Sequence, residues 1–244
     1  SGSRRQRVAK KMGRLFGVGT GPGDPELVTR KAWRVVSEVS VVAYPAPDHG
    51  NSFSRQIMAD AISHDAIEIP IVIPMISGRA PAQAIYDDAA AQILEYLNKG
   101  HDVAVLCEGD PLFYGSFMYL LARLRDDVAV EMIPGVSSLV ASASAALRPL
   151  AARSDILTVL AAPLSDDQLE AAIQHAEAVA IIKLGRHLDR IQALIRRLGL
   201  INQAIYISHA SLPHQKVMPL ADAPDDAPYF SMILIYKGSD PWIK

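Results

Sequence analysis

The stretch "GVGTGPGDPEL", residues 17–27, follows a short apolar strand pattern and carries a glycine at every second position from 17 to 23. So little side-chain bulk normally lets another group approach the backbone closely. A phosphate is the first candidate, and the dinucleotide fingerprint G-x-G-x-x-G has its third glycine at the sixth position. Counted from Gly17 the sixth residue is Pro22, and counted from Gly19 it is Asp24. The fingerprint is therefore absent.

The residues that replace the third glycine disfavour a phosphate. Pro22 has no backbone N–H, and Asp24 adds a negative charge where a pyrophosphate would lie. The chain also lacks a G-x-x-x-x-G-K-[ST] phosphate loop. This loop therefore suits a cation, or a ligand that tolerates an acid. Taken alone, "GPGDP" also fits a tight turn into a helix, with Pro25 at the first helical position.

Two more loops follow apolar strand patterns. "CEGDPLFYGS" places Glu108 and Asp110 after "DVAVL", and "IPGVSS" places two serines after "VAVEM". Nearly continuous apolar strands indicate a parallel sheet that is covered on both faces. Ligands of such sheets lie outside the carboxyl ends of the strands, so we expect the three loops to line one crevice. Acids and hydroxyls there suit a sulfonium-bearing, amino-acid-like cofactor better than a dinucleotide.

Strand and helix patterns alternate along the chain. Apolar spacing predicts helices over 25–39, 80–98 and 188–198, and a capping box at Ser165 and Gln168 predicts the start of another. Pro70 interrupts the strand pattern over 66–73, which favours an edge position. Gly100 and Gly199 stand where helix C-caps belong. Further strands are predicted at "VSVVAY", "ILTVLAAP", "AVAIIKLG", "AIYISHA" and "YFSMILIYKG".

The proline-bearing stretch "LRPLAARSD", residues 147–155, interrupts this rhythm. The expected fold class is therefore α/β, with two α/β domains joined by a short linker. We expect an N-terminal domain over 13–148 and a C-terminal domain over 149–244. Residues 1–12 contain basic side chains and no acid, and they begin with "SGS". We expect them to be an expression leader or a disordered arm, with Met12 as the natural start.

Composition and charge exclude several classes of protein. The 244 residues are 50% hydrophobic and carry a net charge of −2; without six positive charges near the N-terminus, 18 basic and 26 acidic residues remain, a net −8. Because the rest of the chain carries this net negative charge, nucleic acid is a poor partner for the protein. No apolar run reaches the roughly 18 residues of a membrane span, and no secretory signal is visible. Cys107 is the one cysteine. We expect it to lie in the core, with no disulfide and no metal site, in a cytoplasmic protein.

The chain resembles the tetrapyrrole methylase family. The resemblance rests on "GVGTGPGDPELVTRKAWRVV", "CEGDPLFYGS" and "IPGVSSLVASASAALRPLA" in this order and spacing, and "IIKLG" and "ISHASLPHQKV" extend it over nearly the whole chain. It implies two α/β domains with a cofactor cleft between them, usually in a homodimer. It also implies that S-adenosylmethionine methylates ring carbons of corrin and sirohaem precursors, leaving S-adenosylhomocysteine. Members that act on uroporphyrinogen III typically have two glycines before Asp-Pro, and Glu108 takes the first place here, which disfavours that substrate.

The same resemblance assigns the site. Pro22 matches a loop that faces the tetrapyrrole, Leu184 matches the apolar residue that packs on the adenine, and the segment at Ala210 and Ser211 matches one that bonds the adenine through its backbone. The matched cofactor-site positions are Pro22, Glu108, Gly109, Asp110, Phe113, Ser137, Ser138, Leu184, Ala210 and Ser211.

Methyl transfer needs no protein nucleophile, and the sequence has no recognisable Ser-His-Asp or Cys-His set. The expected catalysis is the alignment of the methyl donor with an electron-rich meso carbon, helped by desolvation of the sulfonium. A base must finally take the proton of that carbon, unless water does. The candidates are Glu108, Tyr114, His49 and His209, and the pattern does not choose among them. Cations that could hold substrate carboxylates are Arg79, Arg148, Arg153, Arg186 and Lys216.

Several alternatives stay open on the sequence. One is a methylase of the same fold that acts at another ring position, or on a cobalt-bound rather than a metal-free ring. A nicotinamide or flavin oxidoreductase is disfavoured by the missing fingerprint. A regulatory module that binds a nucleotide without catalysis is disfavoured because loops on both the donor and the substrate sides are present.

Overall fold

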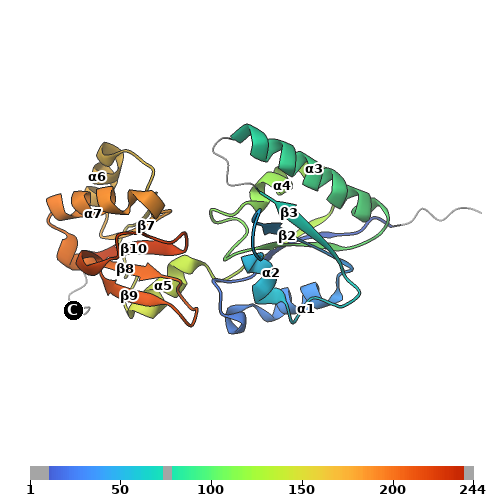
Figure 1. Ribbon diagram of the computed structural model, residues 1–244, viewed down its shortest axis with the longest axis horizontal. Helices are drawn as coiled ribbons and strands as arrows, with labels where there is room; N and C mark the ends of the chain where they lie inside the picture. The colour runs from blue at the N-terminus through green and yellow to red at the C-terminus, as the bar shows by residue number, and fades with distance from the viewer. Residues whose placement is uncertain (1–10, 74–78, 239–244) are drawn as a thin grey trace, which may run out of the picture. The chain divides into compact units, whose positions relative to one another are not determined.

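The computed structural model describes residues 11–73 and 79–238, and it divides into two compact units at the step from Ser137 to Ser138. Each unit is an α/β structure built on one five-stranded sheet (Figure 1). Residues 1–10 of the expected leader lie outside the described residues.

The sheet of the first unit is parallel throughout, with the strand order β3-β2-β4-β1-β5. The central strand β4 is buried at every position, as its continuous apolar pattern predicted. Pro70 lies in the edge strand β3, which confirms the expected edge position. The strands are β1 (Leu15–Gly19), β2 (Val41–Ala46), β3 (Ile67–Val72), β4 (Val103–Cys107) and β5 (Val130–Ile133).

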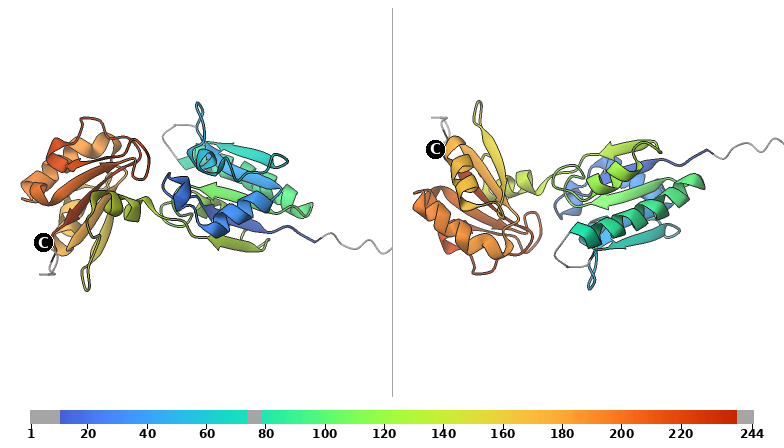
Figure 2. Two further views of the ribbon diagram at one scale, coloured as in Figure 1. Left: turned by 90° about the horizontal axis from the view of Figure 1, so that it is seen from below. Right: turned by 90° about the horizontal axis from the view of Figure 1, so that it is seen from above.

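Helices cover both faces of this sheet. The pair α3 and α4 packs on one face and the pair α1 and α2 on the other (Figures 1 and 2). Cys107 belongs to the core under α3 and α4, and its burial raises the pKa of the thiol to about 12. The expected core position of this cysteine is confirmed. The helices are α1 (Arg30–Glu38), α2 (Phe53–Met58), α3 (Arg79–Asn98) and α4 (Phe117–Leu124).

The sheet of the second unit is mixed, with the order β6-β7-β10-β8-β9. Strands β6 and β7 are parallel, whereas β10 runs antiparallel to both β7 and β8, and β9 runs antiparallel to β8. Helices α6 and α7 cover one face and α5 covers the other (Figure 1). The elements are α5 (Ser138–Ala146), β6 (Leu157–Ala161), α6 (Asp166–His175), β7 (Ala178–Ile182), α7 (Leu188–Arg197), β8 (Ala204–Ser208), β9 (Lys216–Pro219) and β10 (Ser231–Tyr236).

The helix predicted from residue 25 is divided in two. Asp24 caps a 3₁₀ turn over Pro25–Leu27, and its side chain accepts a hydrogen bond from the Glu26 N–H. The backbone is extended at Val28, and helix α1 begins after its N-cap Thr29. The Thr29 hydroxyl accepts a hydrogen bond from the Ala32 N–H at 3.0 Å. Two N-capping side chains five positions apart each begin a helix, and this local preference overrides the continuous apolar spacing.

The first unit ends earlier than the boundary expected between residues 148 and 149. Helix α5 was expected in the N-terminal domain, but Leu139, Ala141 and Ala143 pack against Ala180 and Ile207 of the second sheet. This burial assigns α5 to the second unit, because a helix belongs to the core that covers its apolar side chains. The proline stretch at 147–155 therefore follows the division instead of forming it.

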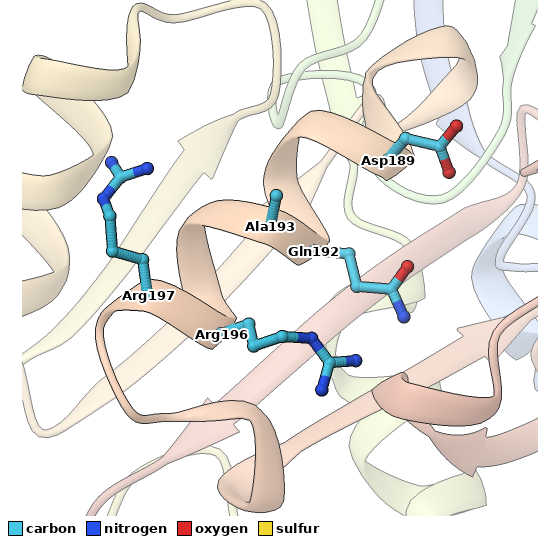
Figure 3. Close-up of a pocket in the computed structure, with 5 residues that line it drawn as sticks. All are labelled: Asp189, Gln192, Ala193, Arg196 and Arg197. Atoms are coloured by element: carbon cyan, nitrogen blue, oxygen red, sulfur yellow. The ribbon is translucent and has the colours of Figure 1, made fainter.

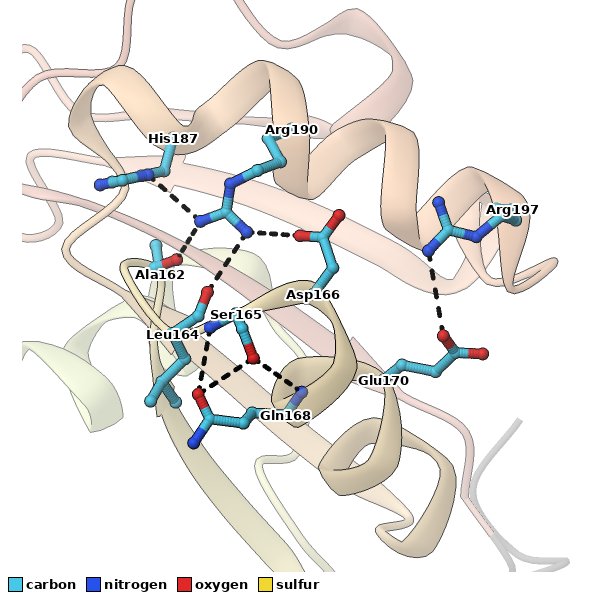
Figure 4. A network of polar contacts seen from close by, with 9 residues as sticks. All are labelled: Ala162, Leu164, Ser165, Asp166, Gln168, Glu170, His187, Arg190 and Arg197. Atoms are coloured by element: carbon cyan, nitrogen blue, oxygen red, sulfur yellow. Dashed lines mark hydrogen bonds and ion pairs between the residues drawn. The ribbon is translucent and has the colours of Figure 1, made fainter.

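Arg190 holds the second unit together on the α6–α7 side (Figure 4). Its guanidinium donates to the Ala162 carbonyl at 2.6 Å, to the Leu164 carbonyl at 3.3 Å and to the Asp166 carboxylate at 2.5 Å. These partners precede or begin α6, and Ser165 closes the predicted capping box with Gln168. One side chain of α7 thus fixes the β6–α6 connection.

We expect Arg190→Ala to lower the free energy of unfolding by about 2 kcal/mol, because it leaves two carbonyls and a carboxylate without their charged donor. Thermal unfolding followed by circular dichroism measures the effect. Arg197→Ala is the matched control, since Arg197 meets Glu170 only at 3.9 Å on the surface of the same helix pair. Its cost should stay below about 0.5 kcal/mol. Equal melting temperatures for the two variants would contradict this role of Arg190.

Candidate functional site

Three loops follow β1, β4 and β5 at one edge of the first sheet, since these neighbouring strands are parallel. Their backbones touch at three glycines. A Cβ atom on Gly19 would lie 2.6 Å from the Gly135 nitrogen and 2.7 Å from the Gly109 carbonyl oxygen, and a Cβ on Gly135 would overlap that same oxygen. The expectation that these glycines admit a ligand thus needs correction at Gly19. What comes close to Gly19 is the backbone of the neighbouring loops.

Hydrogen bonds fasten the first loop to the second. The Thr20 N–H and hydroxyl both donate to the Cys107 carbonyl, at 2.8 and 3.1 Å. Gly21 and Gly109 then exchange two backbone hydrogen bonds, at 3.2 and 2.8 Å. Thr20 is fully buried, and the sequence-based prediction of the site missed it. Its signal was present, because a polar residue at the end of a buried strand needs a partner.

Asp110 fastens the second loop to the third. One carboxylate oxygen accepts from the Leu112 N–H at 2.9 Å, and the other accepts from the Gly135 N–H at 3.0 Å. Both oxygens therefore hold the loops in place. The family resemblance implied that Asp110 wraps the cofactor, and the structure gives this carboxylate a structural task at the same place.

Glu108 differs from Asp110 although the two are nearly adjacent. It directly follows β4 and is partly buried, and within the described parts of the chain its carboxylate has no hydrogen-bond donor or cation. Burial raises the pKa of Glu108 to about 7. A carboxyl with such a pKa exchanges protons near neutral pH.

Aromatic side chains extend from the same loop. Phe113 and Tyr114 pack edge to face with ring centroids 5.0 Å apart, and 38% and 49% of the two residues are exposed. Tyr114 also has a positive φ of 54°. Exposed neighbouring rings on a fixed loop offer an apolar surface to a ligand.

Four further candidates differ in exposure. Pro22 is buried in the first loop, Ser137 is partly buried, and Ser138 is exposed at the start of α5. We call the place where the three loops touch at Gly19, Gly109 and Gly135 the three-loop crossing. His49 is exposed on the loop after β2 and takes no part in this crossing. The crossing thus gathers Glu108, Gly109 and Asp110 but not His49.

In the second unit, β7 and β8 run in the same direction, because each is antiparallel to β10 between them. Their carboxyl ends therefore lie at one edge. Three residues that are not glycine have positive φ there: Lys183 at 59°, His209 at 51° and Ser211 at 74°. Such backbone costs of order 1–3 kcal/mol each and gathers at functional sites. A single sequence carries no signal for this strain.

The candidates at this edge are placed as follows. Leu184 is fully buried in the core under α6 and α7. Ala210 is buried, and the Ser211 N–H donates to the Gln215 side chain at 2.9 Å. Burial, followed by the charges of His214 and Lys216, lowers the pKa of His209.

The expected cations are mostly exposed where the structure describes their side chains. Arg148 donates to the Gln203 carbonyl at 3.1 Å, and Arg153, Arg186 and Lys216 are exposed. The side chain of Arg79 lies outside the described residues. No three His, Cys, Asp or Glu side chains of the described residues come together to hold a metal ion. Within the same residues, no helix is long and apolar enough to cross a membrane.

A surface hollow of about 460 Å³ lies along α7 (Figure 3). Arg196 and Arg197 extend to different sides of the helix, and Gln192 donates to the Leu220 carbonyl at 2.9 Å. None of the sequence-predicted site residues is in its lining, which consists of Asp189, Gln192, Ala193, Arg196 and Arg197.

These features define the class of the protein. No lysine or arginine occurs in the three loops, at 20–28, 108–116 and 134–138, whereas Glu108, hydroxyls and backbone groups do. Such an edge offers no side-chain cation to a pyrophosphate, and its carboxyl group favours a ligand with a positive centre, such as a sulfonium or an ammonium. The protein is a two-unit α/β protein whose strand-end loops in the first unit carry acids, hydroxyls and backbone groups.

Comparison with known proteins gives the family. The family model for tetrapyrrole (corrin/porphyrin) methylases matches residues 14–224, and the chain belongs to this family. It is 36% identical to a precorrin-2 C(20)-methyltransferase from a Sinorhizobium species, over 92% of this chain and 95% of that protein. It is 39% identical to the cobalamin biosynthesis protein CobIJ of Mycobacterium tuberculosis, over 93% of this chain.

The chain spans 46% of the length of CobIJ, about half of that relative. Among solved structures, it resembles the uroporphyrin-III C-methyltransferase of Thermus thermophilus, crystallised in complex with S-adenosylhomocysteine. The TM-score is 0.68 at 23% identity, over 92% of this chain and 98% of that one. At this identity the likeness shows the fold, and it confirms the expected α/β class.

Proposed function

We propose that this chain methylates precorrin-2 at C20 to give precorrin-3A, with S-adenosylmethionine as the methyl donor, in the biosynthesis of the corrin ring. The observation that carries the proposal is the 36% identity to a precorrin-2 C(20)-methyltransferase over nearly the full length of both chains. Within the sequence, "GTGPGDPELVTRKAWRVV", "AYPAPDHGNSFSRQI" and "IPMIS" favour this member of the family, and Glu108 in place of a glycine disfavours uroporphyrinogen III.

The donor supplies an electrophilic methyl group on a sulfonium. From the family resemblance we assign to its site Pro22, Glu108, Gly109, Asp110, Phe113, Ser137 and Ser138, the apolar residue Leu184, and the backbone at Ala210 and Ser211. The rigid crossing at Gly19, Gly109 and Gly135 holds this edge in a fixed geometry, which alignment of donor and acceptor requires. The three loops of the crossing, at 20–28, 108–116 and 134–138, contain no lysine or arginine that would repel the positive sulfur.

The acceptor is the ring itself. An electron-rich meso carbon of the ring attacks the methyl group. The residues of the site therefore have to bind and orient the ring and finally remove the proton of that carbon, and none of them has to act as a nucleophile. The exposed rings of Phe113 and Tyr114 provide apolar surface for a macrocycle. Arg153, Arg186 and Lys216 are candidates for its carboxylates. We further propose a cytoplasmic homodimer, and light scattering tests the dimer.

A binding experiment and an activity assay test the proposal. Calorimetry should detect S-adenosylhomocysteine binding and no binding of NAD. Anaerobic incubation with S-adenosylmethionine and metal-free precorrin-2 should then add one methyl mass. A gain only on the cobalt-loaded ring would move the chain to the cobalt-dependent route, and a gain on neither ring, despite tight S-adenosylhomocysteine binding, would reassign the ring position. NAD binding without S-adenosylhomocysteine binding would overturn the proposal.

A further inference from the structure

Two carboxyl groups stand side by side in the loop after β4 and have different surroundings. Asp110 uses both oxygens to accept backbone hydrogen bonds from Leu112 and Gly135. Glu108 accepts none from the described residues, and no described cation lies beside it. A partly buried carboxyl without a partner is costly to keep ionised, so a fold retains one where a task requires it.

The backbone on both sides of Glu108 is fixed. The Cys107 carbonyl accepts two hydrogen bonds from Thr20, and Gly109 exchanges two with Gly21. Glu108 itself lies between these pairs, at the edge of the sheet where ligands of parallel sheets bind. The backbone that carries the Glu108 side chain is therefore held in place. Such a fixed position is what a group needs if it must reach one particular atom of a bound molecule.

The other candidates for a base are less suited. Tyr114 is half exposed, so the loop does not shield its side chain from water. His49 is exposed outside the crossing, and His209 lies in the second unit beside His214 and Lys216, which disfavour a further proton. Only Glu108 combines burial, a fixed backbone and a place in the crossing.

We propose that the Glu108 carboxylate accepts the proton that C20 loses after methyl transfer; this inference rests on the proposed function. In the first step the carbon–sulfur bond breaks with its electron pair on sulfur, and C20 forms the new carbon–carbon bond. In the second step the C20–H bond breaks, its electron pair returns to the ring, and the proton moves to Glu108. The carboxylic acid then releases that proton to water, so charge and atoms balance.

The titration of Glu108 fits this task. With a pKa of about 7 the carboxylate form is available at neutral pH and is more basic than an ordinary glutamate. The charged groups nearest to it along the chain are Asp110, a negative neighbour, and the buried Cys107 thiol, which stays protonated. Neither Asp110 nor Cys107 would therefore accept the proton instead of Glu108.

The test compares Glu108→Gln with Glu108→Asp and with Glu95→Gln, a surface carboxyl on α3, as the matched control. We expect Glu108→Gln to lower the rate of methyl transfer at saturating S-adenosylmethionine about 100-fold or more. This loss should exceed the change in the Kd for S-adenosylhomocysteine, which can also respond because Glu108 belongs to the assigned donor site. Glu108→Asp should recover part of the rate. In the wild type kcat/KM should rise with pH up to about 7 and then level off, and this rise should vanish in Glu108→Gln.

A second measurement does not depend on activity. A raised pKa means that the folded state holds the proton more tightly than the unfolded state, so this stabilisation is present at low pH and is lost as the pH rises through about 7. The Tm of Glu108→Gln should therefore increase relative to the wild type between about pH 5 and pH 8. Glu95→Gln should show no such trend.

The outcomes separate the two claims. An active wild type with an equally active Glu108→Gln overturns the proton-acceptor role alone. Weaker binding of S-adenosylmethionine but not of S-adenosylhomocysteine, with the pH rise unchanged, also overturns it, because Glu108 would then pair with the sulfonium. A wild type that methylates no tetrapyrrole overturns the proposed function, and the role with it.

Discussion

Gly135→Ala is expected to destabilise the first unit by about 3 kcal/mol or more and to abolish S-adenosylhomocysteine binding. The added Cβ would overlap the Gly109 carbonyl oxygen and would lie 2.9 Å from the Gly19 Cα. Both obstacles are backbone, so no side chain can turn aside to make room. The loops after β1, β4 and β5 would have to separate, and the hydrogen-bonded pair of Gly21 and Gly109 would be strained with them.

Thermal unfolding and calorimetry measure these effects, with Gly50→Ala as the control. Gly50 has a positive φ of 93°, and a Cβ atom added to it would meet no other atom within 4 Å, because the space beside it is open. Its substitution should cost only about 1 kcal/mol of backbone strain and leave S-adenosylhomocysteine binding intact. If Gly135→Ala folded and bound S-adenosylhomocysteine as Gly50→Ala does, the crossing of the three loops would not organise the site.

Asp110→Ala is expected to lower the free energy of unfolding by about 2–4 kcal/mol, since two hydrogen bonds to a charged acceptor are lost. The Leu112 and Gly135 N–H groups would lose their partner, and the second and third loops would no longer be tied. S-adenosylhomocysteine binding should weaken about tenfold or more, because the loops lose their fixed geometry.

Asp110→Asn provides a graded comparison, because its single amide oxygen can replace one of the two acceptors. Its melting temperature should fall between those of the wild type and Asp110→Ala. Asp65→Ala, at an exposed carboxyl of the same unit, is the surface control and should change the stability by less than about 0.5 kcal/mol. Should Asp110→Ala melt like Asp65→Ala, the carboxylate would not hold the loops together.

Much of the fold was predictable because burial imposes a period on the sequence. The continuous apolar run of β4 predicted a covered parallel strand, Pro70 predicted an edge, and Ser165 with Gln168 predicted the start of α6, and all three are confirmed. The division of the predicted helix at Val28 was missed, since two capping side chains outweigh apolar spacing there.

The second unit was less predictable. The antiparallel strands β9 and β10 carry patterns that do not specify a direction, and direction follows from pairing partners far along the chain. Helix α5 is rich in small residues, so its sequence does not reveal which sheet it covers. Tertiary packing decides both features.

For the candidate site, the sequence identified the loops but not the role of each residue. It treated the glycines as places where a ligand approaches, and the structure shows that Gly19 and Gly135 let loops approach one another. It grouped Glu108 with Asp110, and only hydrogen-bond partners and burial separate them. The positive φ values at Lys183, His209 and Ser211 leave no mark on residue type.

The position of the transferred methyl group is tested with S-adenosylmethionine that carries a carbon-13 label on its methyl group. The chain is incubated anaerobically with metal-free precorrin-2, and the product is examined by carbon-13 NMR. The proposed function predicts one enriched methyl signal, from a methyl group bonded to C20 of the ring. A methyl group at another ring position, or a tetrapyrrole that gains no label while a known methylase labels the same substrate, would contradict it.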